Sequence, residues 1–242
     1  MTYSIDKLTL GRKSWLKLAN IPAKFVGWKL EDCVDLSESS QKELQGWVSK
    51  VKTGFVIRAY GGKMCGRGLL FAGSPGLGKS TVGAALLQEM ITTFPLKSFD
   101  TESKALSRPV YFTSYTGLIS LRGQIISGDY EEREYKLWHG ILGDCKDDSF
   151  NIRVLVIDDV GAEHNYTSGW QKSLLHEVLR GRYEKGLPTI ITSNTNPKDW
   201  KDLYSPATQS FLNEAFFQIR LATDEGDLRL RNGGQKINPG IS

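Results

Sequence analysis

The chain has 242 residues, of which 40% are hydrophobic and 24% charged, and its formal net charge is +4. This is the balance of an ordinary globular protein, large enough to bury a core without disulfides, and it excludes disordered, collagen-like and low-complexity chains. The mild positive charge permits contact with nucleic acid but does not require it.

Residues 1–20 are polar and basic, and we expect an arm or a short helix there. No apolar signal-peptide core is visible, and no later apolar run is long enough to span a bilayer, so we expect a cytoplasmic protein without membrane contact. The three cysteines, Cys33, Cys65 and Cys145, form no CxxC pair. This spacing fits a reducing compartment and argues against a zinc site.

From Ile21 onward, short apolar runs alternate with helical patterns. The expected strands are residues 68–73, 110–113, 154–157 and 189–192. The expected helices follow the glycine-rich loop as far as Pro95, and then cover residues 118–142 with a break at 127–128, residues 168–185 and residues 209–221. Strands that alternate with helices predict an α/β fold, with a mostly parallel sheet covered by helices on both faces. Ligands of such sheets bind beyond the carboxyl ends of the strands.

A phosphate-binding motif follows the first expected strand. The run Gly73-Ser-Pro-Gly-Leu-Gly-Lys79-Ser80 matches the pattern G-x-x-x-x-G-K-[ST] of P-loop nucleotide-binding proteins. Glycines let backbone N–H groups turn toward an anion, and the helix that follows adds its positive end. We expect Lys79 to reach the β- and γ-phosphates of ATP and Ser80 to bind Mg²⁺. The predicted ATP-binding residues are Gly73, Ser74, Pro75, Gly76, Leu77, Gly78, Lys79, Ser80 and Thr81.

Two further strand ends carry polar side chains that complete a P-loop ATPase site. The third expected strand ends in Asp158 and Asp159. In P-loop enzymes the first such acid binds Mg²⁺ and the second polarises the attacking water. Thus Asp158 is the predicted metal residue and Asp159 the predicted general base. Asn194 follows the next strand, where an amide can hold the water or contact the γ-phosphate, although Ser and Asn also favour turns.

Three runs of residues together resemble the DnaC/DnaI-type replicative helicase loaders, of which the transposition helper ATPase IstB is a close relative. They are Ile157-Asp-Asp-Val-Gly-Ala-Glu163, Trp170-Gln-Lys-Ser-Leu-Leu-His-Glu177 and Arg182-Tyr-Glu-Lys-Gly-Leu-Pro-Thr-Ile-Ile-Thr-Ser-Asn194. Upstream, Ile21-Pro22-Ala-Lys-Phe25 is similar to the start of that family's ATPase module. The resemblance covers about residues 21–231.

The resemblance implies a AAA+ domain over residues 21–242 behind a basic arm at 1–20, with ATP bound between the subunits of a ring or spiral. It implies sensor I at Asn194 and sensor II at Arg229, and it suggests Arg220 as the arginine finger because that residue would end the helix after sensor I. The sequence departs from the family at Gln218, where a second arginine is usual. It also shows no sign of the separate helicase-binding domain that family members often carry.

The resemblance also implies single-stranded DNA binding by the helices of residues 115–145. Aromatic and cationic side chains there could stack on bases and follow phosphates, while ordinary helix packing with Trp138 in the core is the alternative. The residues in question are Tyr115, Arg122, Tyr130, Arg133, Lys136 and Trp138. The expected function is ATP-dependent loading of a replicative helicase onto single-stranded DNA. The alternatives are an IstB-like helper of a transposase, or a nucleotide-gated interaction module with little turnover.

Overall fold

The computed structural model describes residues 9–30, 33, 38–52, 65–95, 106–161 and 169–221, and the structural statements below concern these residues. They contain one sheet of five strands in the order β2-β3-β4-β1-β5, and each neighbouring pair is parallel. The strands are β1 (Gly68–Ala72), β2 (Val110–Ser114), β3 (Val154–Val160), β4 (Thr189–Ser193) and β5 (Phe216–Arg220). The predicted α/β fold with a parallel sheet is confirmed.

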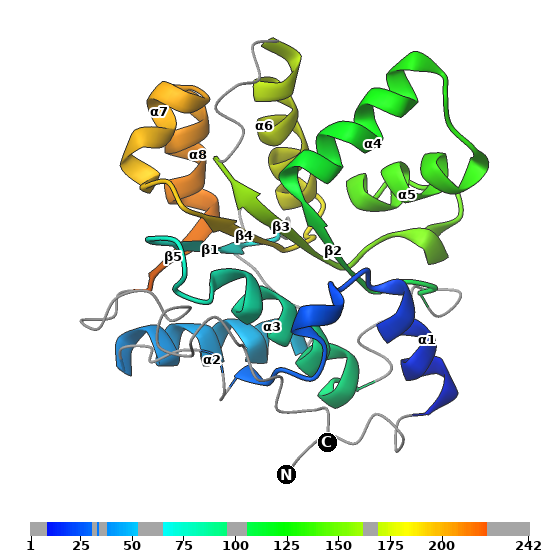
Figure 1. Ribbon diagram of the computed structural model, residues 1–242, viewed down its shortest axis with the longest axis horizontal. Coiled ribbons are helices and arrows are strands. Elements are labelled where there is room, and N and C mark those ends of the chain that lie inside the picture. Colours follow the sequence, from blue (N-terminus) through cyan, green and yellow to red (C-terminus); the bar gives the residue numbers. More distant parts are fainter. Residues whose placement is uncertain are drawn as a thin grey trace.

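Helices cover both faces of this sheet (Figure 1). One face carries α1 (Leu10–Leu18), α2 (Glu38–Lys52) and α3 (Lys79–Thr93). The other face carries α4 (Tyr115–Ser127), α5 (Glu132–Leu142), α6 (Gly169–Glu184), α7 (Trp200–Leu203) and α8 (Pro206–Ala215). Short 3-10 turns are η2 (Ala23–Phe25), η5 (Asp148–Phe150) and η6 (Pro197–Asp199). No helix in the described ranges has the length and apolar character needed to cross a membrane.

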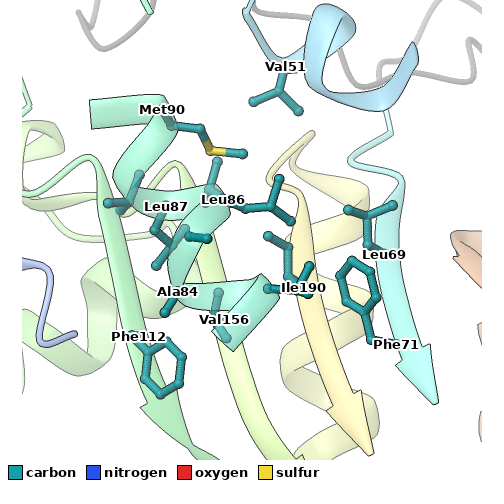
Figure 2. Packing of buried hydrophobic residues seen from close by; sticks show 14 of the residues in the cluster. Val51, Leu69, Phe71, Ala84, Leu86, Leu87, Met90, Phe112, Val156 and Ile190 are labelled. Carbon is teal, nitrogen blue, oxygen red and sulfur yellow. The ribbon is translucent and has the colours of Figure 1, made fainter. Parts of the chain in front are cut away.

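The sheet separates two hydrophobic cores because each strand sends alternate side chains to opposite faces. In β3, Val154 and Val156 belong to the core beneath α3, whereas Leu155 and Ile157 belong to the core beneath α4 and α6. Both faces are therefore buried, which explains why the strands are almost continuously apolar in the sequence. Figure 2 shows the first core, in which side chains of α3 lie over the sheet: Leu86, Leu87 and Met90 face Leu69, Val156 and Ile190.

The N-terminal helix α1 packs into the first core and does not stand apart from it. Trp15 is buried, and its indole N–H donates to the Leu106 carbonyl at 2.9 Å. Arg12 donates to the Phe94 carbonyl at 2.7 Å, just after the end of α3. The chain then runs along β2, where the Phe112 N–H donates to the Ala19 carbonyl at 2.8 Å. Asn20 Nδ2 also donates to the Phe112 carbonyl at 2.9 Å. The two bonds at Phe112 occupy backbone groups at the outer edge of β2, an edge that would otherwise be open to pairing.

The sequence prediction for residues 209–221 is wrong in its second half. The helix α8 ends at Ala215, and Phe216–Arg220 form β5, which pairs with β1. Phe216 belongs to one core while Phe217 and Ile219 contact the other, as expected for a strand buried between two helical layers. Arg220 therefore ends a strand and not a helix, so the reason for choosing it as the arginine finger no longer holds.

Candidate nucleotide-binding site

The P-loop, residues 73–78, joins the carboxyl end of β1 to the start of α3, as predicted. Gly73 has φ +154°, and a Cβ on it would lie 2.7 Å from the Leu221 carbonyl oxygen. Gly78 has φ 78° and caps α3, whose first residue is Lys79. Other residues rarely adopt these left-handed conformations. The first-turn N–H groups of α3 have no carbonyl partner within the helix, so this end of the helix suits an anion.

Lys79 is buried, and its ammonium lies against the loop itself. Nζ donates to the carbonyl oxygens of Gly73 at 2.8 Å and Ser74 at 2.7 Å. Within the loop Ser74 and Pro75 are exposed, whereas Gly76 and Leu77 are buried, as is Thr81 in the first turn of α3. A cation held inside a loop of turned backbone is what the phosphates of ATP require. The residues predicted to bind ATP thus lie together in this loop and the first turn of α3.

The acidic pair sits on a β-bulge between β3 and β4. Ile157 pairs with Ile191 and Val160 with Ser193, so Asp158 and Asp159 together lie opposite Thr192. Asp159 has φ 59°, a left-handed conformation that is uncommon outside glycine. Bulges of this kind redirect side chains at the ends of strands. Here the half-buried Asp158 lies at the end of β3 beside the exposed Asp159.

Thr192 holds this bulge in place, a role that sequence reasoning did not give it. Its hydroxyl donates to Asp158 Oδ1 at 2.5 Å and accepts the Asp159 N–H at 2.9 Å. Asn194 Nδ2 donates to Asp159 Oδ1 at 2.8 Å, which brings the predicted sensor to the predicted base. The one signal for Thr192 in the sequence was a polar residue at the end of an apolar strand.

Electrostatics at Asp158 fit a divalent cation. Burial raises the pKa of the Asp158 carboxyl above its ordinary value, and the charge of Asp159 adds to this rise, while hydrogen bonds from Thr192 and Ser80 and the charge of Lys24 oppose it. A cation bound at Asp158 would stabilise the carboxylate that burial disfavours. The Ser80 side chain is close enough to Asp158 to lower the pKa of its carboxyl, so both predicted Mg²⁺ ligands are in one place. Hard oxygen ligands of this kind suit Mg²⁺.

This raised pKa predicts that Asp158→Asn stabilises the nucleotide-free protein. Because the folded pKa lies above the unfolded one, the contribution of Asp158 to stability is present below the unfolded pKa and is lost as pH rises through the folded pKa. Asparagine carries no charge and keeps an acceptor for Thr192. We expect the free energy of unfolding at pH 8, measured with urea, to rise by roughly 0.5–2 kcal/mol.

The gain from Asp158→Asn should shrink as the pH of the urea titration is lowered toward the ordinary aspartate pKa. Asp129→Asn changes an exposed carboxylate in the turn after α4 and serves as the control, with no gain expected. An equal gain in both variants would contradict the burial argument, because it would reflect only the change in net charge.

The remaining predicted site residues are placed as follows. The backbone of Arg220 lies opposite Ala72 at the end of β1, next to the P-loop, and Arg229 falls outside the described residues.

Of the residues considered for DNA, Tyr115 and Trp138 are buried, and Tyr115 donates its hydroxyl to the Gln171 carbonyl. For these two aromatic residues, helix packing and not base stacking is the observed role.

The other four of these residues remain on the surface of α4, α5 and their connection. Tyr130 and Tyr135 are exposed and stacked, with ring centroids 5.8 Å apart. The guanidinium of Arg122 lies 4.9 Å from the centre of the Trp138 ring. Arg133 and Lys136 line a separate cavity, described below.

No model of a protein family matches this chain, and no curated protein sequence matches it either. Several solved structures, by contrast, match this chain in fold. The chain is similar to DnaI (TM-score 0.55, 19% identity), with the match covering 84% of this chain and 95% of DnaI. It is also similar to the DnaC helicase loader (TM-score 0.54, 21% identity, 83% of this chain and 100% of DnaC). A third match is AMPPCP-bound DnaA from Aquifex aeolicus (TM-score 0.55, 14% identity, 88% of this chain and 54% of DnaA).

These likenesses show the fold. The chain has the AAA+ P-loop fold of DnaI, of DnaC and of the matched part of DnaA, so the resemblance to helicase loaders noted in the sequence holds at the level of the fold. The match spans almost the whole of the solved DnaI and DnaC chains but about half of the solved DnaA chain.

Proposed function

We propose that this chain is a cytoplasmic AAA+ ATPase that loads a replicative helicase onto single-stranded DNA. One observation carries the proposal. Five polar side chains gather at the carboxyl ends of β1, β3 and β4, namely those of Lys79, Ser80, Asp158, Asp159 and Asn194. They do so in a chain whose fold matches nearly all of the solved chains of DnaI and of the DnaC helicase loader. A fold alone hosts many functions, so this set of side chains gives the proposal its chemistry.

Each residue has a distinct role in the proposed site. Lys79 and the P-loop amides would bind the phosphates of ATP, and Ser80 and Asp158 would hold Mg²⁺, which would supply positive charge to those phosphates. Asp159 accepts a proton from the attacking water, and Asn194 orients Asp159 through its hydrogen bond. The helix-end argument for Arg220 does not survive, so Arg220 as the arginine finger and Arg229 as sensor II are proposed on the resemblance to helicase loaders alone. The proposed assembly is a homo-oligomer formed with ATP.

The loader function predicts a nucleotide-dependent contact with the helicase. The tagged chain should retain the purified replicative helicase several-fold better with ATP and Mg²⁺ than with ADP, because loss of the γ-phosphate removes a contact that orders the assembled state. The measurement is a pull-down, with Lys79→Ala as the control that is expected to show no difference between the two nucleotides.

Two other outcomes of the pull-down would replace this proposal. Retention of a purified transposase in place of the helicase would indicate an IstB-like helper. Retention that depends on ATP binding while the chain hydrolyses no ATP would indicate a nucleotide-gated interaction module.

A further inference from the structure

A cavity of about 310 Å³ lies at the amino end of β2. Its lining includes residues of both α1 and α5, two helices that lie on opposite faces of the sheet (Figure 1). Its walls come from four separate segments. Leu18 ends α1, Ser107 and Arg108 precede β2, and Phe150 ends η5. The first turns of α5 supply Glu132, Arg133, Lys136 and Leu137. Segments far apart in the sequence thus build one site that opens to the surface.

This cavity holds more positive than negative charge. Lys136 pairs with Glu132 at 2.6 Å, and its Nζ also lies 5.0 Å from the centre of the Phe150 ring. Arg108 and Arg133 have no ion-pair partner among the residues that the structure describes. Two guanidinium groups in one cavity therefore lack a counter-charge.

Arg108 is the more constrained of these two cations. Its Nε is buried and has no hydrogen-bond partner within the described part of the chain. The guanidinium lies 5.1 Å from the centre of the Tyr111 ring. Burial lowers the pKa of Arg108, Tyr111 opposes this, and the charge of Arg133 adds to it. A buried donor without an acceptor destabilises the protein unless a ligand supplies that acceptor.

We propose that this cavity binds a phosphate group between Arg108 and Arg133. Guanidinium groups match the oxygens of a phosphate with paired N–H donors, and such charge-assisted hydrogen bonds are the strong ones. One phosphate would give the buried Nε an acceptor and offset the repulsion between the two arginines. The apolar walls of Leu18, Leu137 and Phe150 leave room for the organic part that carries the phosphate.

The proposed phosphate site is separate from the nucleotide site. Arg108 comes just before Val110, the first residue of β2, whereas the P-loop, Asp158 and Asn194 lie at the carboxyl ends of the strands. The two sites therefore lie at opposite ends of the parallel strands, one at the amino ends and the other at the carboxyl ends. The phosphate has two possible sources, a free phosphate compound and the backbone of a nucleic-acid strand. The second source would extend the proposed function by placing a contact for single-stranded DNA, but the cavity itself does not depend on that function.

The test measures the binding of two probes to matched variants of the protein. Fluorescence anisotropy follows a labelled oligo-dT, and calorimetry follows inorganic pyrophosphate on a Lys79→Ala background, in which the P-loop cation is removed. The variant is Arg108→Gln. The control is Arg180→Gln, which removes the same charge from an exposed helix position where the arginine pairs with Glu184. Arg133→Gln is the second variant, since Arg133 is exposed and its replacement does not threaten folding.

We expect Arg108→Gln and Arg133→Gln each to weaken binding of at least one probe roughly tenfold or more, and Arg180→Gln to leave it nearly unchanged. A lower affinity for oligo-dT, with a shallower dependence of that affinity on salt, identifies a nucleic-acid backbone as the source of the phosphate. A lower affinity for pyrophosphate alone identifies a free phosphate compound. Equal effects of all three variants, or no loss for either probe, overturn the proposal. ATP affinity of the otherwise wild-type variants reports on the P-loop separately, so failure of the nucleotide site is not confused with failure of this cavity.

Discussion

Replacing Arg182 by alanine is expected to lower the free energy of unfolding by roughly 3–5 kcal/mol, a large part of the stability of a typical domain. Arg182 lies in α6 and is fully buried, and no carboxylate among the described residues pairs with it. Its guanidinium donates to the carbonyl oxygens of Ile152 at 3.2 Å and Pro188 at 3.1 Å, and to Thr189 Oγ1 at 3.0 Å. It also donates to the carbonyls of Ile141 and Arg153.

These bonds connect the end of α5, the approach to β3 and the start of β4, all on the face that carries α6. Burial lowers the pKa of Arg182 to about 9, so the side chain is still protonated at neutral pH. Alanine would leave several buried carbonyl groups without donors and would also leave a cavity, and the two losses add. The measurement is urea unfolding followed by circular dichroism.

The matched control is Arg180→Ala on the same helix. Arg180 Nε pairs with Glu184 at 3.0 Å, but both side chains are exposed, and such a pair contributes only about 0.3–0.5 kcal/mol. Arg182→Lys should restore little stability, because one ammonium cannot reach acceptors spread over three segments. Equal urea midpoints for Arg182→Ala and Arg180→Ala would show that the hydrogen bonds of the buried arginine do not stabilise the fold.

The P-loop could be predicted from the sequence because its chemistry depends on local spacing. The positions from Gly73 to Ser80 are fixed by the turn of one loop and the first turn of one helix, so no distant contact is needed to place them. The acidic pair was predictable for a related reason, since a buried parallel strand must end at the sheet edge where ligands bind. Where an element is defined by its own sequence, the prediction and the structure agree.

The error at β5 shows the limit of this reasoning. Phe211, Leu212, Ala215, Phe216 and Ile219 recur at helical spacing, so the segment fits one helix. The strand forms because residues 216–220 pair with β1, which lies far away in the sequence. Thr192 was missed for the same reason, because its importance depends on a bulge in the register of β3 against β4. Pairing between distant segments cannot be read from local periodicity.

The cavity at Arg108 could not be predicted at all, since four segments contribute to it. From the sequence, Arg133 and Lys136 were candidates for contact with the phosphates of single-stranded DNA, with ordinary helix packing as the alternative, and Arg108 lay outside every expected helix and strand. Only the packing of α1 and α5 at the β2 edge brings them together.

Replacing Asp159 by asparagine is expected to lower the ATPase rate by roughly 100-fold or more, with little change in ATP affinity. The substitution isolates one property. Asp159 has φ 59°, a conformation that asparagine tolerates well, and the side-chain oxygen that accepts from Asn194 is kept. The backbone N–H bond to Thr192 is also kept, so the variant loses the negative charge and the ability to take a proton from water.

The variant Asn194→Ala tests how much the orienting residue contributes to the ATPase rate, apart from the contribution of the base Asp159. This variant keeps the Asp159 carboxylate but removes the donor at 2.8 Å, so its rate should fall less than that of Asp159→Asn. Both rates are measured as phosphate release at saturating ATP, with affinity taken from a fluorescent nucleotide. A rate for Asp159→Asn within a few-fold of wild type would remove the general-base assignment. If wild type is no faster than Asp159→Asn while both bind ATP, the acidic pair serves nucleotide binding alone, and the chain acts as a gated interaction module.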